Sequence, residues 1–183
     1  MTAPAFLLFG AHGDLAFRML WPSLFRLHCD GSLPADMAVF GISRSGSTDE
    51  LHVHLHKSLA DELNEGNRAH FDSFLAKVEF VNLDAGQAAD YAGLADILRG
   101  RGRHVAISYL SMPPDLFAPI VENLQAAGLI DPRTRVILEK PIGKDLASSR
   151  AISDGVAKAL AEDQTYRIDH YLGKEAVQNL LAL

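Results

Sequence analysis

A glycine-rich turn near the start of the chain has the composition and spacing of a phosphate-binding loop. The segment Gly10–Ala16 (GAHGDLA) follows a short apolar run and precedes a segment with helical periodicity. Glycine at a strand end permits a tight turn, and a second glycine lets the backbone approach a pyrophosphate. The amino terminus of the next helix offers N–H groups and a positive dipole. Tight turns without a ligand also use glycine, but the position after the first predicted strand favours a nucleotide site.

The second predicted strand ends in a basic and hydroxyl-rich segment, Gly41–Ser45 (GISRS). A protein that selects NAD usually has an acid here for the ribose 2′-hydroxyl, whereas Arg44 beside Ser43 suits the 2′-phosphate of NADP. The first acid after this strand is Asp49. The pattern therefore favours NADP over NAD. The alternative is a surface arginine in a loop.

A charged pair follows the fifth predicted strand. Glu139 and Lys140 begin the segment EKPIGK, at the edge where parallel sheets bind ligands. The proline and glycine that follow restrict the backbone beside them. From the spacing alone, a ligand site and an exposed ion pair before a turn are equally good interpretations.

The richest cluster of polar residues is RIDHYLGKE, residues 167–175. If a helix begins near Tyr171, His170 and Lys174 lie four residues apart and point the same way. Together with the Tyr171 hydroxyl they would form a phosphate-binding cup at a helix amino terminus. The alternative is a helix start with solvated charges, capped by Asp169.

Alternating strands and helices would position these residues. Short apolar runs predict buried parallel strands, and longer segments with apolar residues three and four apart predict helices between them. This alternation predicts an α/β fold of the Rossmann type, a doubly wound parallel sheet with helices on both faces. The predicted strands are Ala5–Phe9, Met37–Phe40, Val78–Val81, Val105–Leu110 and Val136–Leu138, and the predicted helices are Leu15–Leu27, Glu50–Leu63, Ala88–Arg99, Leu116–Ala126 and Asp145–Ala161.

Composition narrows the class of protein. The 183 residues suffice for one domain with a sizeable core, and the net charge of −6 argues against a nucleic-acid or anionic-membrane surface. No apolar run approaches the roughly 20 residues that span a bilayer. The lone Cys29 allows no internal disulfide and is expected to be a small core residue on a helix. We therefore expect a cytoplasmic protein that binds neither nucleic acid nor membrane.

The motifs GAHGDLA, GISR, YLSMPP, EKPIGKDL and RIDHYLGKE, in this order, resemble glucose-6-phosphate dehydrogenase. The similarity runs from Phe6 to Leu183. It implies an NADP-binding Rossmann domain over residues 1–168 and, over 169–183, the first helix of a substrate domain. The apolar helix Lys174–Leu183 ends without a cap, so we expect a truncated chain. The complete enzyme is expected to be a homo-oligomer that oxidises glucose 6-phosphate to 6-phosphoglucono-lactone, in the pentose phosphate pathway.

The resemblance also implies roles for individual residues. Asp169 would orient a histidine base that lies further along the family's chain, so that the present chain by itself is expected to be inactive. Lys140 would reach both the nicotinamide and the sugar. The remaining residues divide between the cofactor, held by Gly10, His12, Gly13, Asp14, Leu15, Ser43 and Arg44, and the sugar phosphate, held by His170, Tyr171 and Lys174.

Two departures from the family bear on catalytic efficiency and substrate preference rather than on the fold. Phe17-Arg18-Met19 stands where lysines are common, and Met19 cannot replace a charge. His12 stands where a small hydroxyl residue is common. It either crowds the phosphate loop or adds a different donor.

Other interpretations stay open. A non-catalytic NADP-sensing module would suit Met19 and a missing base, and another Rossmann sugar oxidoreductase would also carry an EKP motif. His52, His54 and His56 alternate, but the surrounding pattern is helical, so a solvated helix surface is favoured over a metal site. Trp21-Pro22 is expected to pack against the first helix or kink it.

Overall fold

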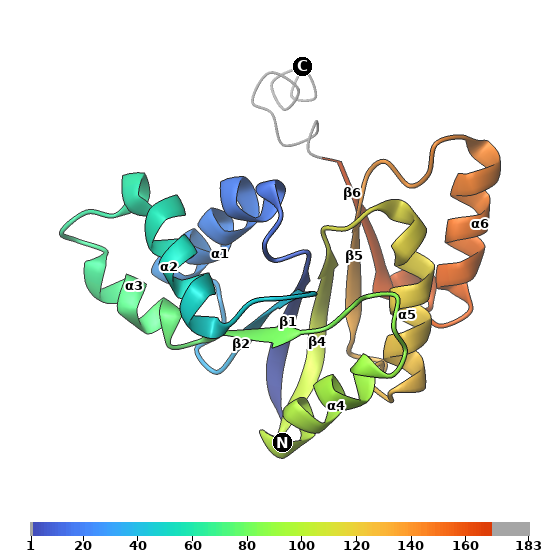
Figure 1. Cartoon of the computed structure of the whole chain (residues 1–183), viewed down its shortest axis with the longest axis horizontal. Helices are drawn as coiled ribbons and strands as arrows, with labels where there is room; N and C mark the ends of the chain where they lie inside the picture. Colours follow the sequence, from blue (N-terminus) through green and yellow to red (C-terminus); the bar gives the residue numbers. More distant parts are fainter. Residues whose placement is uncertain (1, 170–183) are drawn as a thin grey trace.

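Six parallel strands form one sheet in the order β3-β2-β1-β4-β5-β6 (Figure 1). The computed structural model describes residues 2–169. Neighbouring strands are parallel throughout, and the order reverses between β1 and β4, as in dinucleotide-binding folds. The strands are β1 Ala3–Phe9, β2 Ala38–Ser43, β3 Val78–Asn82, β4 Arg103–Leu110, β5 Arg135–Glu139 and β6 Thr165–Ile168.

Helices cover both faces of this sheet, which confirms the predicted doubly wound architecture (Figure 1). Helices α1 to α3 lie over one face and α4 to α6 over the other. Short turns of 3₁₀ helix, η2 Ala60–Glu62, η3 Pro114–Leu116 and η4 Glu162–Gln164, complete the connections. The helices are α1 Trp21–Cys29, preceded by the π-helical turn η1 Ala16–Leu20, α2 Thr48–Ser58, α3 Arg68–Leu75, α4 Asp90–Gly100, α5 Phe117–Ala126 and α6 Leu146–Ala157.

The two faces of the sheet bury separate hydrophobic clusters because side chains alternate along each strand. On β1, Phe6 and Leu8 join the helices α1 to α3 in what we call the first cluster. Leu7 and Phe9 join the helices α4 to α6 in the second cluster. Cys29, at the end of α1, is partly buried against the first cluster, as expected.

Two elements were not predicted, and two helices are shorter than expected. The strand β6 has the sequence Thr-Tyr-Arg-Ile, which contains no apolar run. It lies at the edge of the sheet, where one side faces solvent, and its Tyr166 is 51% exposed. α3 is a short helix held by the buried Phe71 and Phe74. The predicted helix Glu50–Leu63 ends at Ser58, and Asp145–Ala161 ends at Ala157.

Side-chain caps begin α2 and α6, where Ser47 and Asp145 accept hydrogen bonds from the backbone N–H of Glu50 and Ser148.

Trp21 fastens the first helix to the glycine-rich turn. Its side chain is fully buried in the first cluster, and its indole Nε1 donates a hydrogen bond of 3.0 Å to the Ala11 carbonyl. The adjacent Pro22 has no N–H and would crowd the carbonyl four residues earlier, and the π-helical turn η1 directly precedes it. Trp21 therefore packs the helix, as expected, and also holds the loop in place.

We predict that Trp21→Phe lowers the free energy of unfolding by about 1–3 kcal/mol, because the buried Ala11 carbonyl loses its donor. Urea unfolding followed by circular dichroism measures this, since Trp21 is the sole tryptophan. Val53→Ala, at a position 52% exposed on α2, is the control and should change stability by less than about 0.5 kcal/mol. Equal effects of the two substitutions would contradict the role of Trp21.

Candidate functional site

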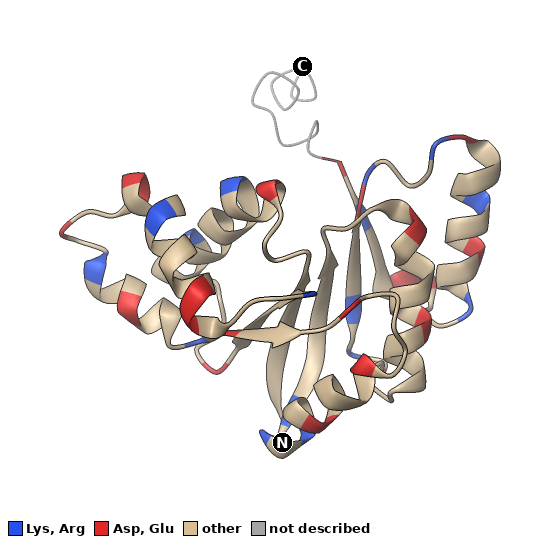
Figure 2. Ribbon diagram, viewed as in Figure 1, with Lys and Arg blue, Asp and Glu red and all other residues tan. Residues whose placement is uncertain are grey.

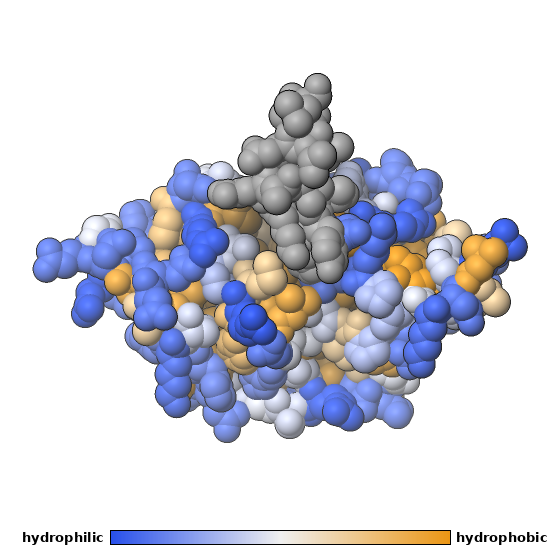
Figure 3. Space-filling model, turned by 90° about the horizontal axis from the view of Figure 1, so that it is seen from above, coloured by the Kyte–Doolittle hydropathy of each residue, from blue (hydrophilic) through white to orange (hydrophobic). Residues whose placement is uncertain are grey.

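A groove crosses the carboxyl edge of the sheet where β1 and β4 separate. Its larger part is a cavity of about 590 Å³ between the ends of β1 to β4, and a second cavity of about 340 Å³ continues toward β5. The two cavities share Gly13 and the segment Ser111–Pro113. Seen from above, hydrophobic residues gather near the middle of this face with hydrophilic residues around them (Figure 3). This is where open parallel sheets bind ligands.

The structure places every predicted cofactor residue along this groove. Those lining the larger cavity are Gly10, His12, Gly13, Ser43 and Arg44, and those lining the smaller one are Gly13, Asp14, Leu15 and Lys140. They come from the ends of three different strands, so the sheet alone brings them together.

Gly10 has a conformation and a position that require glycine. Its φ is +80°, and a Cβ built there would overlap the Ser111 carbonyl oxygen. Its N–H donates to the Ile42 carbonyl at 3.0 Å, and its own carbonyl accepts from Gly13 at 2.8 Å. The turn is thus compact, and it aims the start of the first helix at the groove. The first N–H groups of a helix have no partner within it, which suits an anionic ligand there.

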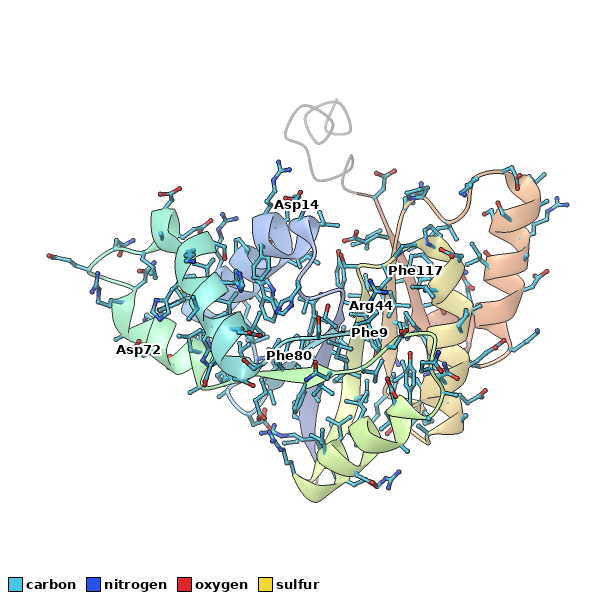
Figure 4. The ribbon with its side chains drawn as sticks, viewed as in Figure 1. Phe9, Asp14, Arg44, Asp72, Phe80 and Phe117 are labelled. Carbon is cyan, nitrogen blue, oxygen red and sulfur yellow. The ribbon has the colours of Figure 1, made fainter. Side chains whose placement is uncertain are left out.

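Arg44 follows the last residue of β2, and its side chain is exposed at the larger cavity (Figure 4). Within residues 2–169 its guanidinium makes no ion pair or hydrogen bond. The neighbouring Ser43 carbonyl accepts from the Leu83 N–H at 2.9 Å, which fixes the start of the loop. Figure 2 shows acidic and basic residues interspersed over both helical layers, so Arg44 is a local charge and not part of a broad basic surface.

Lys140 and Asp169 meet because β5 and β6 are neighbours. The Lys140 N–H donates to the Ile168 carbonyl, and Lys140 Nζ lies 3.4 Å from Asp169 Oδ2. The Lys140–Pro141 peptide bond is cis. Two predicted site residues that are far apart in sequence are therefore in contact at one end of the groove.

Glu139 lines the smaller cavity next to Lys140 but, unlike Lys140, is largely buried. Its carboxylate is buried and accepts a hydrogen bond from the Tyr109 hydroxyl of β4. Burial, and then this hydrogen bond, raise the pKa of Tyr109, which therefore stays protonated as a donor. The sequence left open an exposed ion pair between Glu139 and Lys140. In the structure, Lys140 forms its ion pair with Asp169.

Several residues at the groove were not predicted. Asp84 and its neighbours in the loop after β3, and Ser111 to Pro113 after β4, line the larger cavity. They directly follow strand ends, and that position could have identified them. The remaining predicted residues, His170, Tyr171 and Lys174, lie outside the described residues.

The three alternating histidines lie on a helix, as expected. His52 bonds the Val78 carbonyl at 2.9 Å, His54 bonds the Glu50 carbonyl at 2.9 Å, and the His56 ring packs edge-on to Phe71. Residues 2–169 contain no group of three histidine, cysteine or acidic side chains placed to hold a metal ion. In the same part of the chain, no helix is long and apolar enough to cross a membrane.

Residues 7–179 match the sequence profile of the glucose-6-phosphate dehydrogenase NAD binding domain. The chain belongs to the glucose-6-phosphate dehydrogenase family. It is 44% identical to the glucose-6-phosphate 1-dehydrogenase of Zymomonas mobilis, over 100% of this chain and 38% of that one. It is 40% identical to that of Mycolicibacterium smegmatis, over 96% of this chain and 37% of the relative. The chain thus spans less than two fifths of these relatives.

A solved structure agrees with this assignment. A glucose-6-phosphate dehydrogenase in complex with its substrate glucose-6-phosphate superposes with a TM-score of 0.86 and 30% identity, covering 99% of this chain and 40% of that one. The cofactor class of this glucose-6-phosphate dehydrogenase domain is accordingly a nicotinamide dinucleotide. The family match also decides against an unrelated oxidoreductase that shares only the EKP motif.

We predict that Gly10→Ala abolishes measurable dinucleotide binding and lowers the unfolding free energy by about 2 kcal/mol or more, since alanine is strained at positive φ and would meet Ser111. Calorimetric titration and urea unfolding measure the two effects. Gly93→Ala is the matched control. Gly93 lies within α4 with nothing near its Cβ position, so alanine there should stabilise by about 0.5–1 kcal/mol and leave binding intact. A Gly10→Ala variant that binds normally would contradict the assigned turn.

Proposed function

We propose that this protein is the coenzyme-binding part of a glucose-6-phosphate dehydrogenase that oxidises glucose 6-phosphate to 6-phosphoglucono-lactone with NADP. The observation that carries the proposal is the match to this family along the chain, together with a groove that contains every predicted cofactor residue. The boundary between an NADP domain at 1–168 and a substrate domain from 169 is part of the proposal. It is supported by the end of β6 at Ile168, the last strand among residues 2–169.

The residues of the groove fit a dinucleotide. Gly10 leaves the space that a Cβ would fill, so the backbone can approach a pyrophosphate at the start of the first helix. Arg44, without a partner among the described residues, would pair with the 2′-phosphate of NADP, and Ser43 would add a hydroxyl beside it. Lys140 lies at the other end of the groove, where a nicotinamide would meet the sugar.

The ion pair of Lys140 with Asp169 defines the side of the groove where the sugar would bind. Lys140 would bind the sugar by charge and hydrogen bonding, and His170, Tyr171 and Lys174 would hold its phosphate. Asp169 would fix the tautomer of the family's histidine base and stabilise its charged form after it takes the 1-hydroxyl proton. A bound nicotinamide dinucleotide would supply the acceptor for the hydride from C1.

Two further expectations accompany this function. The complete enzyme would be a homo-oligomer and would work in the cytoplasm, where a lone thiol such as Cys29 stays reduced. Size-exclusion chromatography with light scattering and cell fractionation would test them.

We predict that the protein binds NADP⁺ more tightly than NAD⁺ and that Arg44→Ala weakens NADP⁺ by roughly 1.5–3 kcal/mol, as for a lost hydrogen bond to a charged group. NAD⁺ affinity should fall far less. Calorimetry with both cofactors measures this. Arg99→Ala is the control, because Arg99 pairs with Asp96 on α4 away from the groove. Equal affinities of the unmutated protein for the two cofactors would refute the 2′-phosphate assignment.

We also predict that the 183-residue chain binds NADP⁺ without oxidising glucose 6-phosphate. General-base catalysis is worth roughly 10²–10⁴-fold, and the base is expected in the part of the family's length that this chain does not match. The assay is NADPH absorbance, with the Zymomonas mobilis enzyme measured beside it as the positive control. Comparable turnover by the 183 residues would show that Asp169 does not depend on a histidine further along. A longer form of this protein that binds NADP⁺ but shows no turnover would instead support an NADP-sensing module.

A further inference from the structure

His12, in the turn after β1, is the centre of an aromatic stack that joins this turn to β3, η1 and α2. Its ring lies nearly parallel to that of Phe80 on β3, with centroids 4.8 Å apart and planes at 15°. Phe17 of η1 stacks on it at 6.0 Å, and His54 of α2 approaches at 6.0 Å with a tilt of 54°. Phe17 and His54 are also 5.5 Å apart, which closes the group. Figure 4 shows Phe80 on the sheet beside α2.

The loop that carries Arg44 rests directly on this stack. Gly46 lies two residues after Arg44 and has a φ of +139°. A Cβ built on Gly46 would lie 2.5 Å from His12 Cε1 and 3.1 Å from Phe80 Cζ, so the backbone is in close contact with both rings. The Asn82 amide, also on β3, donates to the Gly46 carbonyl at 3.0 Å. The position of the loop therefore depends on where the His12 ring stands.

The state of the ring suits packing rather than anion binding. His12 Nε2 is buried and has no hydrogen-bond partner within residues 2–169. Burial, and then the neighbouring His54, lower the pKa of His12, against weaker opposing effects of Glu50 and the Ser45 backbone. The ring is thus neutral near neutral pH and acts as an aromatic plate. The ring therefore lies among neighbouring aromatic rings, a packing role that the sequence did not indicate.

We propose that His12 is a positioning residue for cofactor discrimination: its ring supports Gly46 and thereby holds the loop 43–47 so that Arg44 faces the 2′-phosphate. The inference rests on the proposed selection of NADP. Discrimination is a difference between two affinities, so a residue that acts only through Arg44 changes the affinity for NADP⁺ far more than that for NAD⁺. A residue that contacts the pyrophosphate changes both alike.

The test compares His12→Ala and His12→Phe with the unmutated protein by calorimetric titration with NADP⁺ and NAD⁺. Alanine removes the aromatic ring, so we expect NADP⁺ affinity to fall about tenfold. This is near the lower end of the range expected when a hydrogen bond to a charged group is lost completely. The fall for NAD⁺ should be under about threefold. Phenylalanine restores the stack without the buried nitrogen and should keep most of the preference. His56→Ala is the matched control and should keep both affinities, because His56 lies on the same helix as His54 but its ring contacts Phe71 of α3.

A double-mutant cycle tests the contact with Gly46. Gly46→Ala should also weaken NADP⁺ selectively, because its Cβ meets the His12 ring. In the His12→Ala background the same substitution should cost clearly less, since the His12 ring, the nearer of the two rings that its Cβ would meet, is gone. Additive effects would overturn the proposed contact. Circular dichroism and thermal unfolding of each variant confirm that the binding data come from folded protein.

The remaining outcomes separate this inference from the proposed function. Equal losses for the two cofactors in His12→Ala, or no loss for either, would overturn the role of His12 while the NADP preference of the unmutated protein still stood. If His12→Phe lost the preference for NADP⁺ over NAD⁺, the proposed role of His12 would also be overturned, because aromatic stacking would then not be what positions the loop. An unmutated protein without preference would overturn both proposals.

Discussion

The absence of a side chain at Gly10 lets two strand ends come together at the centre of the sheet. The Ser111 carbonyl after β4 occupies the place where a Cβ would be, and the Ser111 N–H donates to the Phe9 carbonyl at 3.1 Å. The chain from β1 therefore turns sharply away from β4, and the groove opens between them. Trp21 holds the next turn from behind through the Ala11 carbonyl. The loop after β2, the stack around His12 and the pair of Lys140 with Asp169 are all arranged around this point.

The central strands could be predicted because a strand buried on both faces leaves an unbroken apolar run, as in Ala5–Phe9 and Val136–Leu138. β6 lacks that signal since it has a neighbour on one side only, and its Tyr166 and Arg167 face solvent. α3 escaped prediction because eight residues carry too few turns to show a period. The end of α2 at Ser58 depends on Leu59 packing into the first cluster, which is a tertiary effect that local propensity does not record.

The residues of the candidate site likewise fall into those that the sequence could predict and those that it could not. Groups carried by one contiguous motif, such as the glycine turn and the loop at Arg44, could be found from spacing because local sequence fixes their geometry. Contacts across strands could not. Asp169 reaches Lys140 only through the pairing of β5 with β6, and Tyr109 reaches Glu139 only through that of β4 with β5. His12 was identified as unusual, but the partners of its ring include Phe80, on a strand two units further along the chain, and no local pattern predicts that contact.

The division of the core into two clusters has a consequence for the order in which the chain can fold during synthesis. Apart from Tyr109, every buried member of the first cluster lies between Phe6 and Val78. The second cluster draws on residues as late as Leu160. Because the ribosome releases the amino terminus first, β1 to β3 and α1 to α3 can pack while the rest is still being translated. The nascent intermediate then exposes the opposite, apolar face of β1, with Leu7 and Phe9, until α4 to α6 arrive, and this is the period in which the chain is most open to a chaperone.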